Sequence, residues 1–177
     1  EILNIQDIIT MVNQILGPTS LEGCALEAAD MNMDGIINIQ DLISLVNTIL
    51  GSARSAQLDG KAQVDYLTSG NDLIVQIASS IDVAGIQIST LIDSQIEIEL
   101  KDNSHITQDS HFHNGLNQYL AYSLFNQPFD SRTTEILLKG AEKIDLEDVQ
   151  LTISDINGDA LYLSYSQSGK NYQAGPR

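Results

Sequence analysis

Two hydrophobic periodicities divide the chain. Up to residue 51, apolar residues recur at helical spacing in two sets: Ile8, Ile9, Val12, Ile15, Leu16 and Leu42, Ile43, Val46, Ile49, Leu50. From residue 61 to about 166 they alternate with polar residues, most clearly in Gln95–Leu100. The pattern predicts two short amphipathic helices that pack face to face, followed by a segment built of strands.

The two helical sets belong to an internal repeat with a shift of 34 residues. When Glu1–Gly17 is aligned with Gly35–Gly51, 11 of 17 positions are identical. In each copy an Asx-rich loop leads to an aspartate, Asp7 or Asp41, at which we expect the helix to begin. Gly17 and Gly51 are expected to end the helices.

The segment after residue 60 predicts about eight short strands, at 62–67, 73–78, 83–91, 95–100, 118–125, 134–139, 149–154 and 160–166. So many strands over roughly 105 residues indicate an antiparallel β-sandwich or jelly roll. The Asn157-Gly158 pair predicts a hairpin between the last two strands. The fold class is therefore α+β with two domains, at 1–51 and 61–168, joined by a small, polar linker at 52–60 and followed by a tail at 169–177.

Charge narrows the class of partner. The chain has 24 acidic and 8 basic residues, and its first 51 residues contain no lysine or arginine. Nucleic acid and anionic membranes need a basic face, so neither is expected as a partner. No apolar run approaches the roughly 18 residues of a membrane-spanning helix. The single cysteine, Cys24, excludes an internal disulfide.

The strongest motif is the twelve-residue stretch from Asp30 to Asp41, which has the spacing of an EF-hand calcium loop. Side-chain oxygens stand at positions 1, 3, 5, 9 and 12, glycine stands at position 6, and position 7 offers a carbonyl. Hard oxygen donors in this order favour Ca²⁺ over Mg²⁺. The predicted ligands are Asp30, Asn32, Asp34, the Ile36 carbonyl, Asn38 and Asp41.

With its 34-residue duplication, aspartate at position 12 and no obvious entering helix, the segment 1–51 resembles a dockerin. That resemblance implies two calcium-loop-and-helix repeats that dock onto a cohesin β-sandwich, and it places the same six ligands on the loop. It also implies partner contacts at loop positions 10 and 11, which are Ile39-Gln40 and, in the first repeat, Ile5-Gln6. These pairs are identical, so either repeat can present the same surface, although they differ from the hydroxyl pair common in cellulosomal members.

The first repeat begins at loop position 6, with Glu1 in place of glycine, so its first ligands are missing. We expect residues upstream of Glu1, or else ligands supplied from elsewhere. A 51-residue unit is small enough that calcium should contribute to its folding free energy.

The second segment resembles a cohesin in two places. Val83-Ala-Gly-Ile-Gln-Ile88 is similar to a stretch near the start of cohesin sandwiches, and 149–166 to the way they end. If both resemblances hold, one chain carries a plug and a socket. A plug that docks on the next copy makes a heterologous contact that propagates into a filament. We expect a non-catalytic, extracellular or cell-surface assembly module that depends on calcium, either a scaffold or a head-to-tail fibre subunit.

Other interpretations stay open. The chain can be the anchoring tail of a larger secreted enzyme, or a carbohydrate-binding module that uses tyrosines such as Tyr119, Tyr122, Tyr162 and Tyr165. An intramolecular clasp between the two segments would give a compact monomer. His105, His111 and His113 admit a zinc site, although a polar surface loop is the commoner explanation. The sequence contains no paired carboxylates in a cleft context and no nucleophile motif, so we do not expect catalysis.

Overall fold

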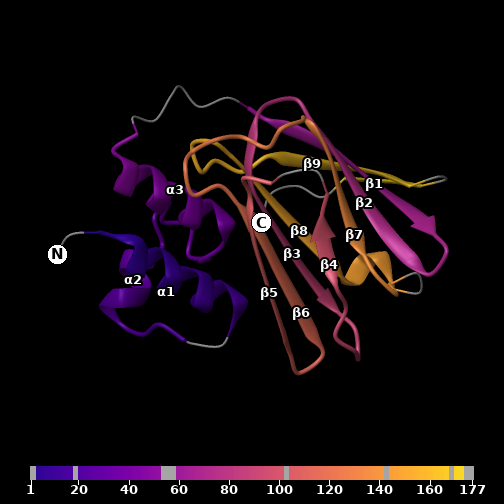
Figure 1. Ribbon diagram of the computed structural model, residues 1–177, viewed down its shortest axis with the longest axis horizontal. Helices are drawn as coiled ribbons and strands as arrows, with labels where there is room; N and C mark the ends of the chain where they lie inside the picture. Colours follow the sequence, from indigo (N-terminus) through magenta and orange to yellow (C-terminus); the bar gives the residue numbers. More distant parts are fainter. Residues whose placement is uncertain are drawn as a thin grey trace.

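The computed structural model describes residues 3–17, 20–52, 59–101, 104–141, 144–167 and 170–173. Three helices precede ten strands: α1 (Ile5–Leu16), α2 (Cys24–Ala29), α3 (Ile39–Leu50), β1 (Lys61–Ser69), β2 (Asp72–Ser79), β3 (Val83–Leu91), β4 (Ile98–Leu100), β5 (Thr107–His113), β6 (Leu116–Tyr122), β7 (Thr133–Leu138), β8 (Val149–Asp155), β9 (Tyr162–Gln167) and β10 (Lys170–Gln173), with a 3₁₀ turn at Leu146–Asp148 (Figure 1). Most of the predicted linker and the end of the predicted tail lie outside the described residues.

The strands form two sheets packed face to face, so the expected β-sandwich is confirmed. One sheet has six strands in the order β10-β9-β1-β2-β7-β4, and the other has four in the order β5-β6-β3-β8. Between them lies a core of aliphatic residues such as Val64, Ile77, Ile86, Ile136 and Ile153, all at most 1% exposed. One pair departs from the antiparallel expectation, because β9 runs parallel to β1.

The predicted hairpin at Asn157-Gly158 is wrong. The turn forms, with Gly158 at φ +90°, but β8 pairs with β3 in one sheet while β9 pairs with β1 in the other. Only the bridge between Ser154 and Ala160 joins the two flanks. The Asn-Gly signal specifies a local reversal of the chain and does not specify which sheet each strand joins.

Truncation in the sandwich core should be costly. Replacing Ile136 with alanine in β7, where the side chain is fully buried, is expected to lower the free energy of unfolding by about 2–5 kcal/mol, because the cavity adds to the lost burial. Urea denaturation measures the loss. The neighbouring Leu137→Ala removes the same number of atoms from the partly exposed outer face, so an equal cost for the two substitutions would contradict this packing.

The helices form one unit, called here the helical unit (α1, α2 and α3), with its own apolar core. Ile8, Met11 and Val12 of α1 pack in this core with residues of α3 that include Leu42 and Val46, which confirms the predicted face-to-face pair. Each of these two helices begins two residues before the predicted aspartate. Asn4 and Asn38 are the N-caps, and Asp7 and Asp41 complete capping boxes at the third helical position.

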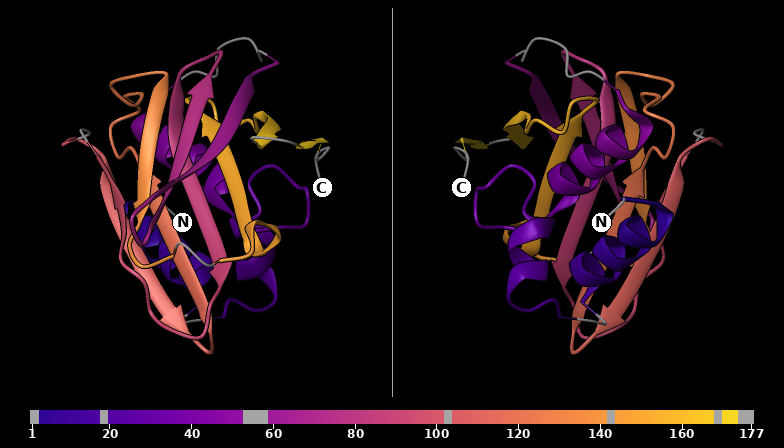
Figure 2. Two further views of the ribbon diagram at one scale, coloured as in Figure 1. Left: turned by 90° about the vertical axis from the view of Figure 1, so that its right-hand side faces the viewer. Right: turned by 90° about the vertical axis from the view of Figure 1, so that its left-hand side faces the viewer.

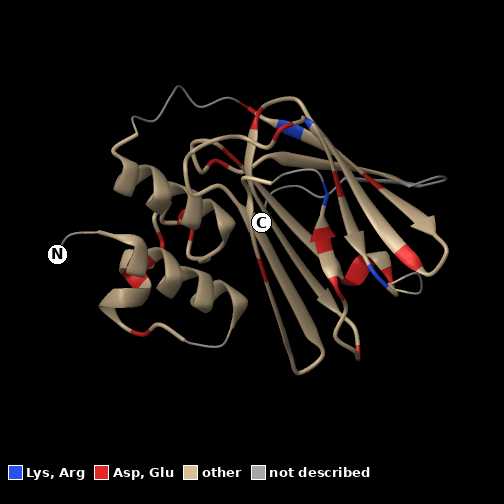
Figure 3. Cartoon of the chain, in the orientation of Figure 1, with Lys and Arg blue, Asp and Glu red and all other residues tan. Residues whose placement is uncertain are grey.

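The helical unit lies against the outer face of the four-stranded sheet, as Figures 1 and 2 show. Its core extends onto that sheet through Ala84 of β3 and Leu120 and Tyr122 of β6. Figure 3 shows acidic residues and no basic ones on the described part of the helices. The fold is therefore a β-sandwich with one outer face covered by an acidic helical unit.

Candidate functional site

The predicted calcium loop lies between α2 and α3. The six-residue helix α2 ends at Ala29, immediately before Asp30, so a short entering helix is present that the sequence did not reveal. Gly35 adopts φ +84°, which is the left-handed turn expected at loop position 6. Met33 also has positive φ, at +62°, and its side chain is 89% exposed.

Asp30 holds the first half of the loop together. Its Oδ1 accepts the backbone N–H of Asp34 at 3.1 Å and its Oδ2 accepts that of Gly35 at 2.9 Å. Asp34 in turn accepts the N–H of Ile36 at 2.8 Å. These bonds curl residues 30–36 around the carboxylate of Asp30, as the predicted ligand order requires.

Asp41 fastens the loop to the start of α3. The side chain is 0% exposed, and its two oxygens accept the backbone N–H groups of Met31 at 2.8 Å, Asn32 at 3.2 Å and Asn38 at 2.9 Å. Burial raises the pKa of Asp41 above its ordinary value, the three N–H donors lower it, and the charge of Asp34 raises it again. Asp34 and Asp41 are therefore close enough to repel each other.

The loop's donors fit a hard cation by chemistry, since they are carboxylate, amide and carbonyl oxygens. Asn38 caps α3 by accepting the N–H of Gln40 at 2.8 Å, and its amide donates to the Ile36 carbonyl at 3.2 Å. Among the described residues, however, no three His, Cys, Asp or Glu side chains are gathered closely enough to hold a metal ion together. The loop thus brings the predicted ligands into one turn without bringing its three aspartates into one cluster.

The same finding bears on the histidines. His111 and His113 lie on one side of β5, with ring centroids 6.3 Å apart. His105 is elsewhere: its Nε2 lies 2.9 Å from the Pro128 carbonyl and its Nδ1 lies 3.6 Å from Asp130. The three histidines therefore do not converge as a zinc site would require.

The second candidate site is the contact between α3 and the sheet, called here the docking interface. From α3 it includes Ile39, Gln40, Ile43, Ser44 and Asn47, and from the sandwich Ala84, Gly85, Gln87, Ile156 and Gly158. Ile39 and Ile43 are 0% and 1% exposed. Their side chains occupy the space over Gly85, where an added Cβ would lie 2.6 Å from Ile39 Cγ1 and 3.0 Å from Ile43 Cγ1.

Polar contacts fix the register of the docking interface. The Ile39 N–H donates to Gln87 Oε1 at 3.1 Å, and the Asn47 amide donates to the Ile156 carbonyl at 2.8 Å. A Cβ at Gly158 would collide with Ser44 and lie 2.9 Å from the Gln40 carbonyl. The turn that carries Gly158 is itself held by the buried Asp155, whose Oδ1 accepts the N–H groups of Asn157 and Asp159.

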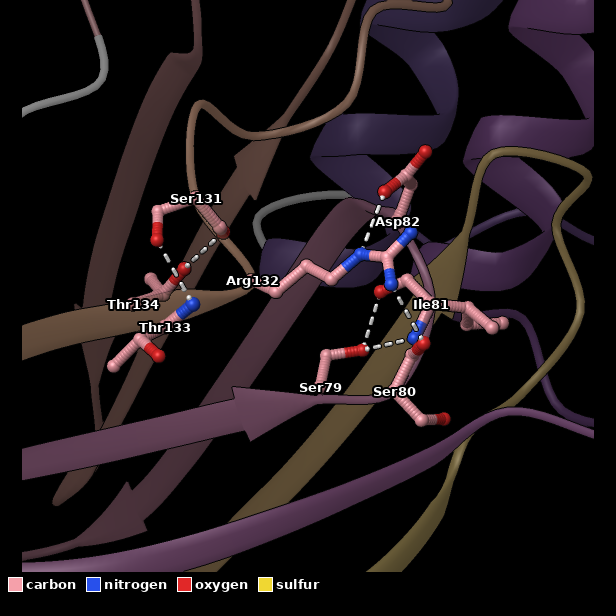
Figure 4. Close-up of polar contacts among 8 residues, drawn as sticks. All are labelled: Ser79, Ser80, Ile81, Asp82, Ser131, Arg132, Thr133 and Thr134. Carbon is pink, nitrogen blue, oxygen red and sulfur yellow. Dashed lines mark hydrogen bonds and ion pairs between the residues drawn. The ribbon is translucent and has the colours of Figure 1, made fainter.

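The strand that carries Gly85 is fixed where it begins. A bulge at Ala84 interrupts the register of β3 with β8, so the consecutive residues Ala84 and Gly85 both face the helical unit, while Val83 and Ile86 join the sandwich core. The Ala84 carbonyl accepts the N–H of Ser123 at 3.0 Å. The loop between β2 and β3 is held by Arg132, which precedes β7 and donates to Asp82 at 3.1 Å and to the Ser80 carbonyl at 3.2 Å (Figure 4). The Ser79 hydroxyl donates to the Ile81 carbonyl in the same loop.

The predicted partner residues occupy two different environments. Ile39 and Gln40 lie in the docking interface, whereas their repeat counterparts Ile5 and Gln6 are exposed, Ile5 by 54%. Ile9, the counterpart of Ile43, is 55% exposed. The end of α1 also contacts the sheet, where Gln118 of β6 donates to the Ile15 carbonyl at 2.8 Å. Gly85, Gln87 and Gly158 were missed as site residues because each looks like an ordinary strand or turn residue.

No protein-family model and no curated protein matches the sequence. Among solved structures, the chain is similar to a non-cellulosomal cohesin from the hyperthermophilic archaeon Archaeoglobus fulgidus, with 13% identity, a TM-score of 0.40, and alignment over 61% of this chain and 86% of that one. It is also similar to the chitin-binding domain of a chitinase from Pyrococcus furiosus, with 13% identity, a TM-score of 0.32, and 62% and 98% covered. The resemblance of the helical unit to a dockerin has no counterpart in these matches.

None of the described helices is both long and apolar enough to cross a membrane. Because no family model matches the sequence, the class of protein is defined by the geometry of the molecule itself. It is a β-sandwich whose four-stranded sheet binds a helical unit through a defined docking interface.

Proposed function

We propose that this chain is a non-catalytic protein-assembly module that acts outside the cell. The observation that carries the proposal is the fit of Ile39 and Ile43 over Gly85. A sheet position without a side chain, filled by two isoleucines and flanked by hydrogen bonds to Gln87 and Ile156, is a surface shaped for a protein helix. The contacting surfaces belong to two units with largely separate cores, so the same contact can form between copies.

Docking between copies makes a head-to-tail contact, because the helical unit of one chain binds the sheet of the next. Such a contact suits a scaffold or fibre subunit. Ile5 and Gln6 repeat Ile39 and Gln40 residue for residue, and we assign them to the same kind of contact made by the other repeat. The exposure of Ile5 and Ile9 supports that assignment, since a solvent-facing helix has no need of isoleucine there.

Calcium is part of the proposal. We assign Asp30, Asn32, Asp34, the Ile36 carbonyl, Asn38 and Asp41 as its ligands, because they combine oxygen donors with EF-hand spacing. Asp34 and Asp41 repel each other when no cation is present, and bound calcium would offset that repulsion. The loop leads directly into Ile39, so ordering the loop also orders the residue that docks. Calcium sites of extracellular modules have dissociation constants on the order of 10⁻⁴–10⁻³ M, so they fill at the calcium concentrations outside cells.

The calcium assignment predicts a stability shift. About 5 mM calcium should raise the free energy of unfolding of the helical unit by roughly 1–2 kcal/mol, if its affinity is that of an extracellular module. Thermal unfolding followed by circular dichroism, in calcium and in EDTA, measures the shift. Asp34→Asn removes one charge while keeping an oxygen for the Ile36 N–H, and it should weaken the response. Equal melting temperatures in calcium and EDTA for the unsubstituted chain would contradict calcium binding.

The assembly function is tested with two full-length variants. The face-blocked chain carries Gly85→Leu, which fills the space over β3, and its helical unit stays intact. The helix-blocked chain carries Ile39→Asp and Ile43→Asp, together with Ile5→Asp and Ile9→Asp, and its sheet stays intact. Mixed in calcium, the two should form a 1:1 heterodimer on analytical ultracentrifugation, and EDTA should dissociate it.

A chain that carries both sets of substitutions is the matched control and should bind neither variant. Circular dichroism of each variant confirms that its helices and strands persist. Two folded variants that stay monomeric when mixed in calcium would refute the proposed function. The carbohydrate-binding alternative is not favoured, since Tyr162 alone is exposed among the five tyrosines whose side chains are described.

A further inference from the structure

In this structure each half of the docking interface is covered by the other half of the same chain. Ile39 and Ile43 of α3 are at most 1% exposed, and Ala84 and Leu120 on the sheet are 0% exposed. A partner can reach neither surface while the intrachain contact persists. The contact therefore competes with any contact of the same kind between chains.

Covalent linkage strongly favours the intrachain contact. The helical unit ends at Leu50 and the first strand of the sandwich begins at Lys61, so only ten residues of the sequence, 51–60, join the two. A short tether gives an effective concentration on the order of 1 mM. A free partner has to outcompete that concentration, so its apparent dissociation constant rises to roughly 1 mM, however tight the unhindered contact is.

The two units can separate without unfolding either one. The sandwich core is made by residues of the sandwich and its loops, such as Ile86, Tyr119 and Phe129, and includes none from the helical unit. The core of the helical unit is made chiefly by α1 and α3 packing on each other, and the sandwich adds Ala84, Leu120 and Tyr122 with the partly buried Leu124 and Ile156. Opening the contact exposes these sandwich residues and the α3 face, and leaves the interior of the sandwich closed.

We call the sandwich side of the docking interface the docking face. We propose that the intrachain contact is autoinhibitory: the helical unit occupies its own chain's docking face and keeps the chain a closed monomer at micromolar concentration. This inference rests on the proposed assembly function and adds its regulation. Docking between chains becomes competitive only where chains are concentrated to about the millimolar level, as on a crowded surface, or where the intrachain contact is broken.

The experiment compares two analytes on one immobilised partner. The helix-blocked chain, whose docking face is open, is fixed to a biosensor surface in calcium. The face-blocked chain, whose helical unit is free, and the unsubstituted chain are then passed over it. We expect the face-blocked chain to bind and the unsubstituted chain to bind tens of times more weakly, up to the factor of about 100 by which Gly85→Leu weakens the intrachain contact. Gly158→Asn, which blocks the face from the turn after β8 with a residue that tolerates positive φ, serves as a second face-blocked variant.

The outcomes separate the two claims. Equal binding by the unsubstituted and face-blocked chains would overturn autoinhibition and leave the assembly function standing. Binding by neither folded analyte would overturn the assembly function, and autoinhibition with it. Stronger binding by both face-blocked variants than by the unsubstituted chain supports the proposal, because a blocked face has no other reason to increase binding by the helices.

Discussion

A leucine at Gly85 is expected to weaken the docking of the helical unit on its own sandwich by about 100-fold. Gly85 has no positive φ, so the substitution introduces no backbone strain and acts through space alone. The first atom of the new side chain would already lie 2.6 Å from Ile39 and 3.0 Å from Ile43. Overpacking of this kind costs about 3 kcal/mol, which corresponds to the stated factor.

Small-angle X-ray scattering measures the effect, because release of the helical unit increases the radius of gyration. Ala78→Leu is the matched control: Ala78 is exposed on β2 in the other sheet, so the same side chain there should leave the scattering unchanged. Far-UV circular dichroism should be the same for both variants, since the two cores stay closed. An unchanged radius for Gly85→Leu would show that α3 does not dock over β3 in solution.

The sequence predicted the elements that have a strong local signal. The repeat and its apolar spacing placed α1 and α3, and the alternation of apolar residues placed most strands. The edge strand β5 was missed because its residues are polar on both faces, as in Gln108 and Asp109, so no alternation marks it. Its Asp109 nonetheless has a structural partner, since it accepts the Tyr122 hydroxyl at 2.8 Å.

The turn at 30–41, to which we assign calcium, has a marked spacing in the sequence, whereas the docking interface has none. Its sandwich side depends on the absence of side chains at Gly85 and Gly158, and a glycine in a sequence indicates a turn or bulge as readily as a contact. Its helical side depends on which of the two similar repeats docks on the sheet. Ile5 and Ile39 have the same neighbours in sequence, yet one is exposed and the other buried. Only tertiary packing distinguishes them.

Loss of the Asp41 carboxylate should unfold the loop and the start of α3. Asp41→Ala leaves the N–H groups of Met31, Asn32 and Asn38 without their acceptor in a buried environment. Each such group costs about 1–3 kcal/mol when it is left unpaired, so the helical unit should lose roughly 3 kcal/mol or more. Urea unfolding followed by the helical circular-dichroism signal measures the loss, and EDTA keeps any effect of calcium out of the comparison.

Asp7 provides the matched comparison, because it holds the same place in the first repeat. Its Oδ2 accepts one N–H, that of Asn4 at 2.8 Å, at an exposed position, so Asp7→Ala should cost only about 1 kcal/mol. If the two alanine substitutions cost the same in EDTA, the capping box alone accounts for Asp41 and its bonds to Met31 and Asn32 contribute nothing. A larger loss at Asp41 means that this carboxylate joins the loop to the helix without any metal, so the proposed calcium would act on a loop already attached to the helix that docks.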